Sequence, residues 1–177
     1  MFRILLQNQK ESIGMIIQKL DEKYVLETYR LAHETIFNLP TYSRRGAEEQ
    51  IKVYTIPNLL EHIKNPDRLS IITIRNDEVV GFLFGVIERL PNDNVFYLEW
   101  NGVNPVHRNT GIMQTMWNTM ELWVKEHKLN GILVDTLTNN NKMINFLQKN
   151  QMNIWAEMKN HWYGHDFFLW GKLCMYV

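Results

Sequence analysis

Residues 103–113 read Val103-Asn104-Pro105-Val106-His107-Arg108-Asn109-Thr110-Gly111-Ile112-Met113 and lie between two strongly patterned runs. The run that leads into them, Val95–Val103, is typical of a β-strand, and the run that follows, Gly111–His127, is typical of a helix. A strand, a short polar loop and a helix start form an anion site, because the loop N–H groups and the positive end of the helix dipole point to one place. This stretch therefore predicts an α/β fold that binds a phosphorylated cofactor.

The rest of the chain continues this mixture of strands and helices. A meander of three strands is expected before the loop, since Leu69–Arg75, Val79–Glu88 and Val95–Val103 are separated by short polar turns. The order predicts a mixed, mostly antiparallel, twisted sheet of about six or seven strands with helices on both faces, an α/β (α+β) architecture. The other expected strands are Phe2–Leu6 at an edge, Ile13–Leu20, Gly131–Thr136, Ile154–Met158 and Asp166–Lys172, and the other expected helices are Asp21–Phe37, Ala47–Tyr54, Pro57–Lys64 and Asn139–Asn150.

Length and composition predict a single domain. The chain has 177 residues, of which 45% are hydrophobic, so it is long enough to bury a sizeable core. We expect one domain over residues 1–177, with residues 1–12 as a short N-terminal extension.

Charge and cysteine content exclude several function classes. The 19 basic and 19 acidic side chains balance, which argues against a nucleic-acid or anionic-membrane surface because both need a basic excess. The single cysteine, Cys174, excludes an intramolecular disulfide and a multi-cysteine zinc site, and we expect no bound metal. A chain without a signal peptide or an apolar run of ~20 residues is expected to be cytoplasmic and not to associate with membranes.

The loop motif resembles the cofactor loop of the GCN5-related N-acetyltransferase (GNAT) superfamily. In that family the loop reads roughly Val-x-Pro-x-x-(Arg/Gln)-x-x-Gly-x-(Gly/Ala). Val103, Pro105, Arg108 and Gly111 stand at the matching places. The resemblance extends over most of the chain, from about Ile13 to Leu173, and implies the GNAT fold with acetyl-CoA as co-substrate.

A second family pattern follows the next strand, in the form Thr-x-x-Asn-x-x-(Met/Ala) and then Lys-x-Gly-Phe. Its counterparts are Thr136 or Thr138, Asn140, Met143 and Lys149. The resemblance implies that the pyrophosphate of acetyl-CoA is held by the loop and that Asn140 helps to fix the pantetheine or the phosphate end. The cofactor-binding residues implied in this way are Val103, Arg108, Asn109, Thr110, Gly111, Ile112, Met113 and Asn140.

The chain departs from the family patterns at three places. Met113 replaces the Gly or Ala that closes the loop motif, so its long side chain must turn into the core or the phosphates must sit differently. Leu147 stands where many members place a tyrosine that protonates the leaving thiolate, and Gln151-Met152 replaces Gly-Phe. Tyr163, in the polar and aromatic turn 161–166, is the best alternative proton donor, although such a turn is more often a solvated loop.

Two residues of the strand before the loop have two readings each. Gly102 either marks a β-bulge or relieves crowding beside Trp100. In the family, a bulge in this strand separates it from the next strand and exposes an N–H group that stabilises the oxyanion. Strict alternation places Tyr97, Glu99, Asn101 and Val103 on one face, opposite Phe96, Leu98 and Trp100. Glu99 is then either the general base that deprotonates an amine or the partner of a nearby Lys or Arg.

The walls of the acceptor site are expected from two segments. In the family, the turn that holds His161, Tyr163 and His165 lines the acceptor, and Tyr42–Gly46 forms the other wall. Arg44 and Arg45 either pair with a carboxylate of the substrate or lie on a solvated loop face.

These readings lead to one predicted function and two alternatives. The chain is expected to transfer an acetyl group directly from acetyl-CoA to a primary amine of a small molecule or peptide, with Glu99 and Tyr163 as catalytic residues. The alternatives are a non-catalytic acyl-CoA sensor of the same fold and an interaction domain without a cofactor. The apolar, tryptophan-rich C-terminal strands are the expected interface if the protein forms a homodimer.

Overall fold

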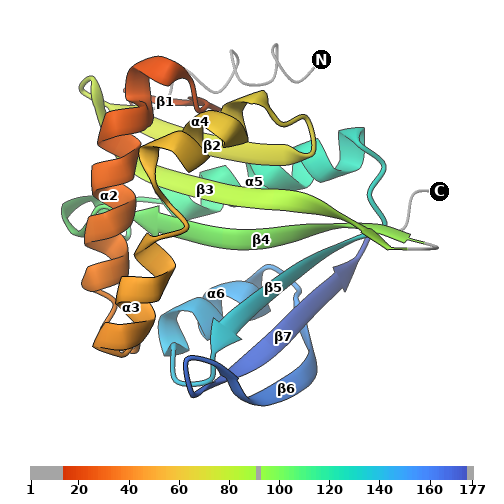
Figure 1. The fold of residues 1–177 in the computed structure, drawn as a ribbon. Coiled ribbons are helices and arrows are strands. Elements are labelled where there is room, and N and C mark those ends of the chain that lie inside the picture. The colour runs from red at the N-terminus through yellow and green to blue at the C-terminus, as the bar shows by residue number, and fades with distance from the viewer. Residues whose placement is uncertain (1–13, 91–92, 175–177) are drawn as a thin grey trace.

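A computed structural model describes residues 14–90 and 93–174, and these residues form a seven-stranded sheet with helices on both faces (Figure 1). The strand order is β1-β2-β3-β4-β5-β7-β6, and every neighbouring pair is antiparallel except β4 and β5. The mostly antiparallel, mixed sheet predicted from the sequence is confirmed. The predicted edge strand Phe2–Leu6 and the N-terminal extension 1–12 lie outside the described residues.

The strands occupy the predicted positions with small changes at their ends. The hairpin between β2 and β3 turns at Asn76 and Asp77, which both have positive φ, as a two-residue turn between twisted strands requires. The strands are β1 Met15–Lys19, β2 Arg68–Arg75, β3 Glu78–Leu90, β4 Asp93–Val103, β5 Gly131–Leu137, β6 Asn153–Trp162 and β7 His165–Leu173.

The helices also follow the sequence pattern. The first one begins as a 3₁₀ turn, η1, which Asp21 caps, and then continues as α2. A helix start at Ala47 was wrong by three residues, because Ser43 caps the helix by accepting a hydrogen bond from the N–H of Gly46 at 3.1 Å. The helices are η1 Glu22–Tyr24, α2 Val25–Phe37, α3 Arg44–Ile51, α4 Ile56–Lys64, η2 Pro105–His107, α5 Ile112–Glu126 and α6 Asn141–Lys149.

The two faces of the sheet carry separate cores. One core packs α5 and α6 against the sheet through fully buried side chains such as Trp117, Met120 and Leu147. The other packs α2, α3 and α4 against the opposite face, with Ile36, Tyr54 and Leu59 at its centre. None of the helices in the described residues is long and apolar enough to cross a membrane.

The last hairpin is longer than the sequence predicted. We expected β6 to end at Met158, but its pairing with β7 resumes at Trp162, which lies opposite His165. Tyr163 and Gly164, with φ of 53° and 79°, form the two-residue turn between them. The polar and aromatic segment is therefore the tip of a hairpin, which fixes Tyr163 in place.

Candidate functional site

The parallel strands β4 and β5 pair at one end and then part. Their register runs from Val95 opposite Gly131 to Leu98 opposite Val134 and stops there. Figure 1 shows the two strands diverging beyond this point toward the ends that lead into the loop before α5 and into α6. On this side of β4, residues 99–103 have no strand partner among the described residues. An extended ligand can therefore pair with this free backbone edge, as an added strand does.

A β-bulge lies where the strands part, but not at the predicted residue. The register with β3 passes from Leu98 to Trp100 and skips Glu99, whereas Gly102 pairs regularly with Phe82. The predicted bulge at Gly102 was therefore wrong. Gly102 serves close packing instead, because a Cβ there would lie 2.6 Å from the ring of Phe82 and 2.7 Å from the methyl group of Thr35.

The extra residue reverses the alternation of β4. Phe96, Leu98 and Val103 all belong to the core under α5, whereas Trp100 packs against the core under α2. The predicted faces, with Trp100 beside Leu98 and Val103 opposite to it, were wrong because a bulge shifts the phase of a strand by one residue.

The loop before α5 presents free N–H groups, as the sequence predicted for an anion site. Gly111 is in the left-handed region, with φ of 83°, and begins the helix without a side-chain cap. The N–H groups of Ile112, Met113 and Gln114 have no acceptor within the described residues, and the first helical bond is donated by Thr115 to Gly111. A Cβ on Gly111 would meet no atom within 4 Å, so this turn of the backbone is open to a ligand.

The other loop residues hold this shape. Arg108 donates from Nε to the carbonyl oxygen of Val103 at 3.2 Å, which ties the loop to the end of β4. Asn109 has a positive φ of 63°, and the hydroxyl of Thr110 donates to the carbonyl of His107 at 2.6 Å. The side chain of Met113 packs against the core, so it does not obstruct the free N–H groups.

Asn140 caps α6 and keeps one polar group free. Its Oδ1 accepts a hydrogen bond from the N–H of Met143 at 3.3 Å. Its amide nitrogen makes no hydrogen bond to the described part of the chain. Asn140 lies three residues after the end of β5 and immediately before α6, at the end of the sheet where β4 and β5 part.

The carboxylate of Glu99 is paired with Arg68, which also contacts His62. Arg68 donates from Nη1 to Oε2 of Glu99 at 2.7 Å, and the same nitrogen lies 2.9 Å from Nε2 of His62. Burial raises the pKa of Glu99, while Arg68 opposes that shift. Burial and the charge of Arg68 lower the pKa of His62 to about 4, so its neutral ring accepts from Arg68. The paired reading of Glu99 is thus the one that the geometry favours.

A second carboxylate on this side of the sheet, Asp135, was missed by the sequence analysis. Trp162 donates from Nε1 to Oδ2 of Asp135 at 3.1 Å, and Tyr97 also hydrogen-bonds to this carboxylate. Burial raises the pKa of Asp135, and these two hydrogen bonds oppose the shift. The signal in the sequence was available, because Asp135 is the one charged residue of the strand Gly131–Leu137.

The two predicted walls of the acceptor site meet. The ring of Tyr42, which precedes α3, stacks on His165 with 5.9 Å between centroids, and its centroid lies 6.5 Å from that of Tyr163. The N–H of Ser43 donates to Nε2 of His165 at 3.3 Å, which ties α3 to the hairpin of β6 and β7. Burial raises the pKa of Tyr42, and the charge of Asp135 adds to this, so the carboxylate and the aromatic wall share one environment.

The arginines of α3 do not take part in this wall. Arg44 pairs with Glu48 at 3.0 Å on the solvated surface of the helix, and Arg45 is also exposed. The solvated reading of this pair is the one that the structure supports.

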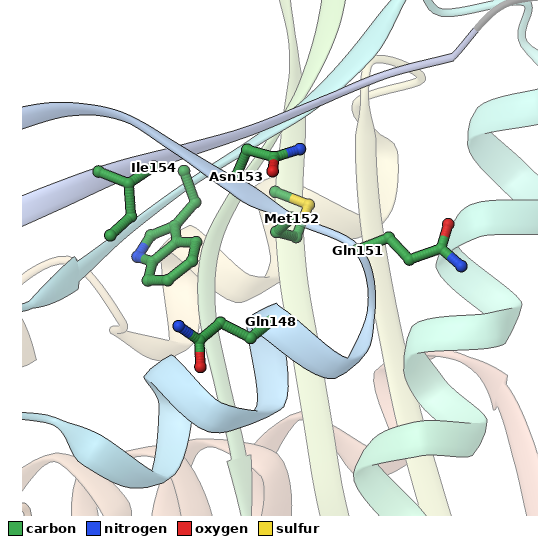
Figure 2. A pocket seen from close by; sticks show the side chains of 6 residues that line it. Gln148, Gln151, Met152, Asn153 and Ile154 are labelled. Carbon is green, nitrogen blue, oxygen red and sulfur yellow. The ribbon is translucent and has the colours of Figure 1, made fainter.

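Within the described ranges, no three His, Cys, Asp or Glu side chains gather in a way that could hold a metal ion. A cavity of about 430 Å³ lies at the C-terminal end of α6, the opposite end from Asn140 (Figure 2). Figure 2 shows that its side chains come from the last turn of α6, the turn that follows it and the start of β6; with Trp170 of β7 they are Gln148, Gln151, Met152, Asn153 and Ile154.

Comparison with known proteins agrees with this geometry. The sequence matches the model of the acetyltransferase (GNAT) family over residues 28–151, which include the free edge of β4, the loop before α5 and Asn140. No curated protein sequence matches the chain significantly.

Solved structures share the fold at low sequence identity. An N-acetyltransferase, PaiA, from Thermoplasma acidophilum in complex with coenzyme A has a TM-score of 0.73 at 19% identity, with 92% of this chain and 100% of that one covered. A GNAT-family acetyltransferase from Streptococcus pneumoniae has a TM-score of 0.73 at 13% identity, with coverage of 90% and 98%. Naa50 of Arabidopsis thaliana, in complex with the bisubstrate analogue CoA-Ac-MVNAL, has a TM-score of 0.65 at 18% identity, with coverage of 90% and 99%.

Proposed function

The chain belongs to the acetyltransferase (GNAT) family, and on that premise we propose that it is an acetyl-CoA-dependent N-acetyltransferase that acts on a primary amine. The observation that carries the proposal is the end of the β4–β5 pairing at Leu98 and Val134, next to a helix start with free N–H groups. A free strand edge suits the amide-containing pantetheine arm, and the free N–H groups suit the pyrophosphate.

The residues for the co-substrate are those of the loop and its surroundings. The N–H groups from Asn109 to Met113 would hold the pyrophosphate, while Arg108 keeps the loop on Val103. Asn140 would bind the pantetheine or the phosphate end through its free amide nitrogen. In the solved relatives, PaiA contains coenzyme A and Naa50 contains a peptide-linked CoA analogue, which supports the same co-substrate and an amine acceptor here.

The acceptor would enter on the opposite side of the free edge, between the two walls. Tyr42, Tyr163 and His165 form an aromatic boundary there, and Asp135 lies close enough to raise the pKa of Tyr42. Glu99 and Asp135 both act on Tyr97 of β4. Alignment of the amine with the thioester would supply much of the rate. Tyr163 is the proposed proton donor to the leaving thiolate, because Leu147 is fully buried and carries no proton to give.

Calorimetric titration with acetyl-CoA, with adenosine and dephospho-CoA as controls, tests the co-substrate. We expect micromolar affinity for acetyl-CoA and none for adenosine. Thiol release is then measured with spermidine, a lysine-containing peptide with a blocked N-terminus, and a peptide with a free N-terminus and no lysine. Absence of acetyl-CoA binding refutes the proposal.

Leu147 favours one alternative, a sensor that binds acyl-CoA without turnover. Acetyl-CoA binding without thiol release for any amine supports the sensor. Thiol release that depends on an added amine excludes it.

A further inference from the structure

Asp135 occupies a special place in the sheet. It follows Val134, the last residue of β5 that pairs with β4, just as the bulged Glu99 follows Leu98 on the other strand. The two carboxylates therefore lie at the point where the strands part, which is where the proposed function brings the thioester and the amine together.

The partners of the two carboxylates differ in charge. Glu99 is neutralised by the guanidinium of Arg68. Asp135 accepts hydrogen bonds from two neutral donors, the Tyr97 hydroxyl and the Trp162 indole. Among the described residues no Lys or Arg forms an ion pair with Asp135. The charge of His161 also lowers the pKa of Asp135. A half-buried carboxylate whose hydrogen-bond donors are neutral keeps its attraction for a cation.

The surroundings of Asp135 also suit an organic cation. The titratable groups that face it come from three elements: Tyr97 on β4, His161 on β6 and Tyr42 before α3. Burial raises the pKa of both tyrosines, and the charge of Asp135 adds to that effect, so they remain neutral aromatic walls at neutral pH. A carboxylate beside aromatic rings is the arrangement that binds ammonium groups.

We propose that Asp135 binds the ammonium group of the acceptor and accepts its proton, and that the acceptor is an aliphatic primary amine that arrives as a cation. This inference rests on the proposed function and names both its substrate class and its base. It assigns the proton transfer to Asp135 rather than to Glu99.

The proton and electron balance is complete. An alkylammonium group has a pKa near ~10.4 and must lose a proton before its nitrogen can attack. That proton passes to the carboxylate of Asp135, and the freed lone pair forms the C–N bond with the acetyl carbonyl carbon. The C–S bond breaks with its electron pair on sulfur, which takes a proton from the hydroxyl of Tyr163. The second proton lost from nitrogen restores Tyr163, and Asp135 releases the first proton to water.

The indole N–H of Trp162 allows a direct test, because it donates to the carboxylate in question. Its ¹H–¹⁵N resonance, assigned with W162F, is followed against pH and with added n-butylammonium chloride. In the wild type we expect a titration in the acidic range, and we expect n-butylammonium to shift the resonance and to lower the apparent pKa. D135N should abolish both responses, while E157Q, a control on an exposed carboxylate of β6, should preserve them.

Kinetics separate a catalytic role from a structural one. With the best amine of the acceptor panel, D135N should reduce kcat/KM by about 100-fold or more and remove the acidic limb of its pH profile, at unchanged acetyl-CoA affinity. The inference is overturned if D135N keeps the ammonium response, or if E99Q and not D135N removes the acidic limb. If the wild type does not bind acetyl-CoA at all, the proposed function itself is refuted.

Discussion

His62 makes the free energy of unfolding depend on pH, and the size of this dependence follows from the pKa of its buried side chain. The residue is 7% exposed, and its pKa is lowered to about 4 from an ordinary value of 6.5. The folded state therefore holds His62 neutral at a pH where the unfolded chain has already bound a proton. Acidification below pH 6.5 thus favours unfolding, and the loss levels off below pH 4, where the folded state is protonated too.

The expected magnitude follows from these two pKa values. Linkage gives a loss in the free energy of unfolding of about 2 kcal/mol at pH 5 and about 3 kcal/mol at pH 4. Between pH 7 and pH 8 the same group contributes almost nothing. The effect is large compared with a typical domain stability of about 5–15 kcal/mol.

Urea unfolding of the wild type and of H62Q between pH 4 and pH 8 measures this contribution. Glutamine offers an oxygen to Arg68 but does not titrate, so it removes the proton and keeps the acceptor. Loss of the edge contact between His62 and Phe84 adds an offset that does not vary with pH. The wild type should lose stability relative to H62Q by the amounts above as the pH falls. A difference that stays constant from pH 8 to pH 4 would refute the reasoning.

Three further predictions concern the parts of the site. G111D should weaken acetyl-CoA binding by about 10-fold or more relative to G111N. Both residues fit the left-handed conformation, but only Asp places a negative charge against the phosphates. Calorimetry at low and high salt measures the two affinities, and equal values would contradict the assigned phosphate site. G102A should lower the free energy of unfolding by about 1–3 kcal/mol, because its Cβ meets Phe82 and Thr35; chemical denaturation measures it, and an unchanged midpoint would show that the contact relaxes. R68M should destabilise the protein by about 1–3 kcal/mol at pH 7, because it leaves Glu99 half-buried and unpaired. This loss of stability relative to the wild type should become smaller toward pH 4, as Glu99 gains a proton. A loss that grows on acidification would argue against the ion pair.

The sequence predicts those features that depend on local chemistry. The loop before α5 is one of them, since a strand, a polar loop with a glycine and a helix start occur together within one segment. The strand order of the meander follows in the same way from short turns such as Asn76-Asp77. For Met113 the sequence left two possibilities open, and the structure shows the first of them, with the side chain packed against the core.

The bulge shows where local chemistry is ambiguous. A glycine in a strand indicates either a bulge or a close approach of two elements, and Gly102 is the second case because Phe82 and Thr35 lie against it. Glu99, which forms the bulge, carries no sequence signal for it. A single misplaced bulge then reverses the predicted direction of every side chain beyond it in the strand.

Contacts between distant segments require the register of the whole sheet. Arg68 reaches Glu99 because Arg68 lies opposite Val86 on β3, and Val86 lies opposite Tyr97 on β4. The pairing of Trp162 with Asp135 likewise depends on how far the last hairpin extends, which the sequence underestimated. Neither the Arg68–Glu99 pair nor the Trp162–Asp135 pair has a sequence spacing from which the contact could be predicted.

The bulge at Glu99 helps to explain why the two carboxylates have different partners. With regular alternation, residues 98 and 100 would share a face, and Trp100 would point toward the core under α5. The extra residue turns Trp100 to the α2 side, where its ring meets Tyr42 edge-on, and ends the pairing of β4 with β5 one residue before Asp135. One inserted residue thus coincides with the free strand edge proposed for the co-substrate, brings Trp100 against Tyr42, and leaves Glu99 paired with Arg68. Asp135 is then the carboxylate at the parting of the strands that has no Lys or Arg partner in the described part of the chain, and this is the position that an ammonium acceptor would fill.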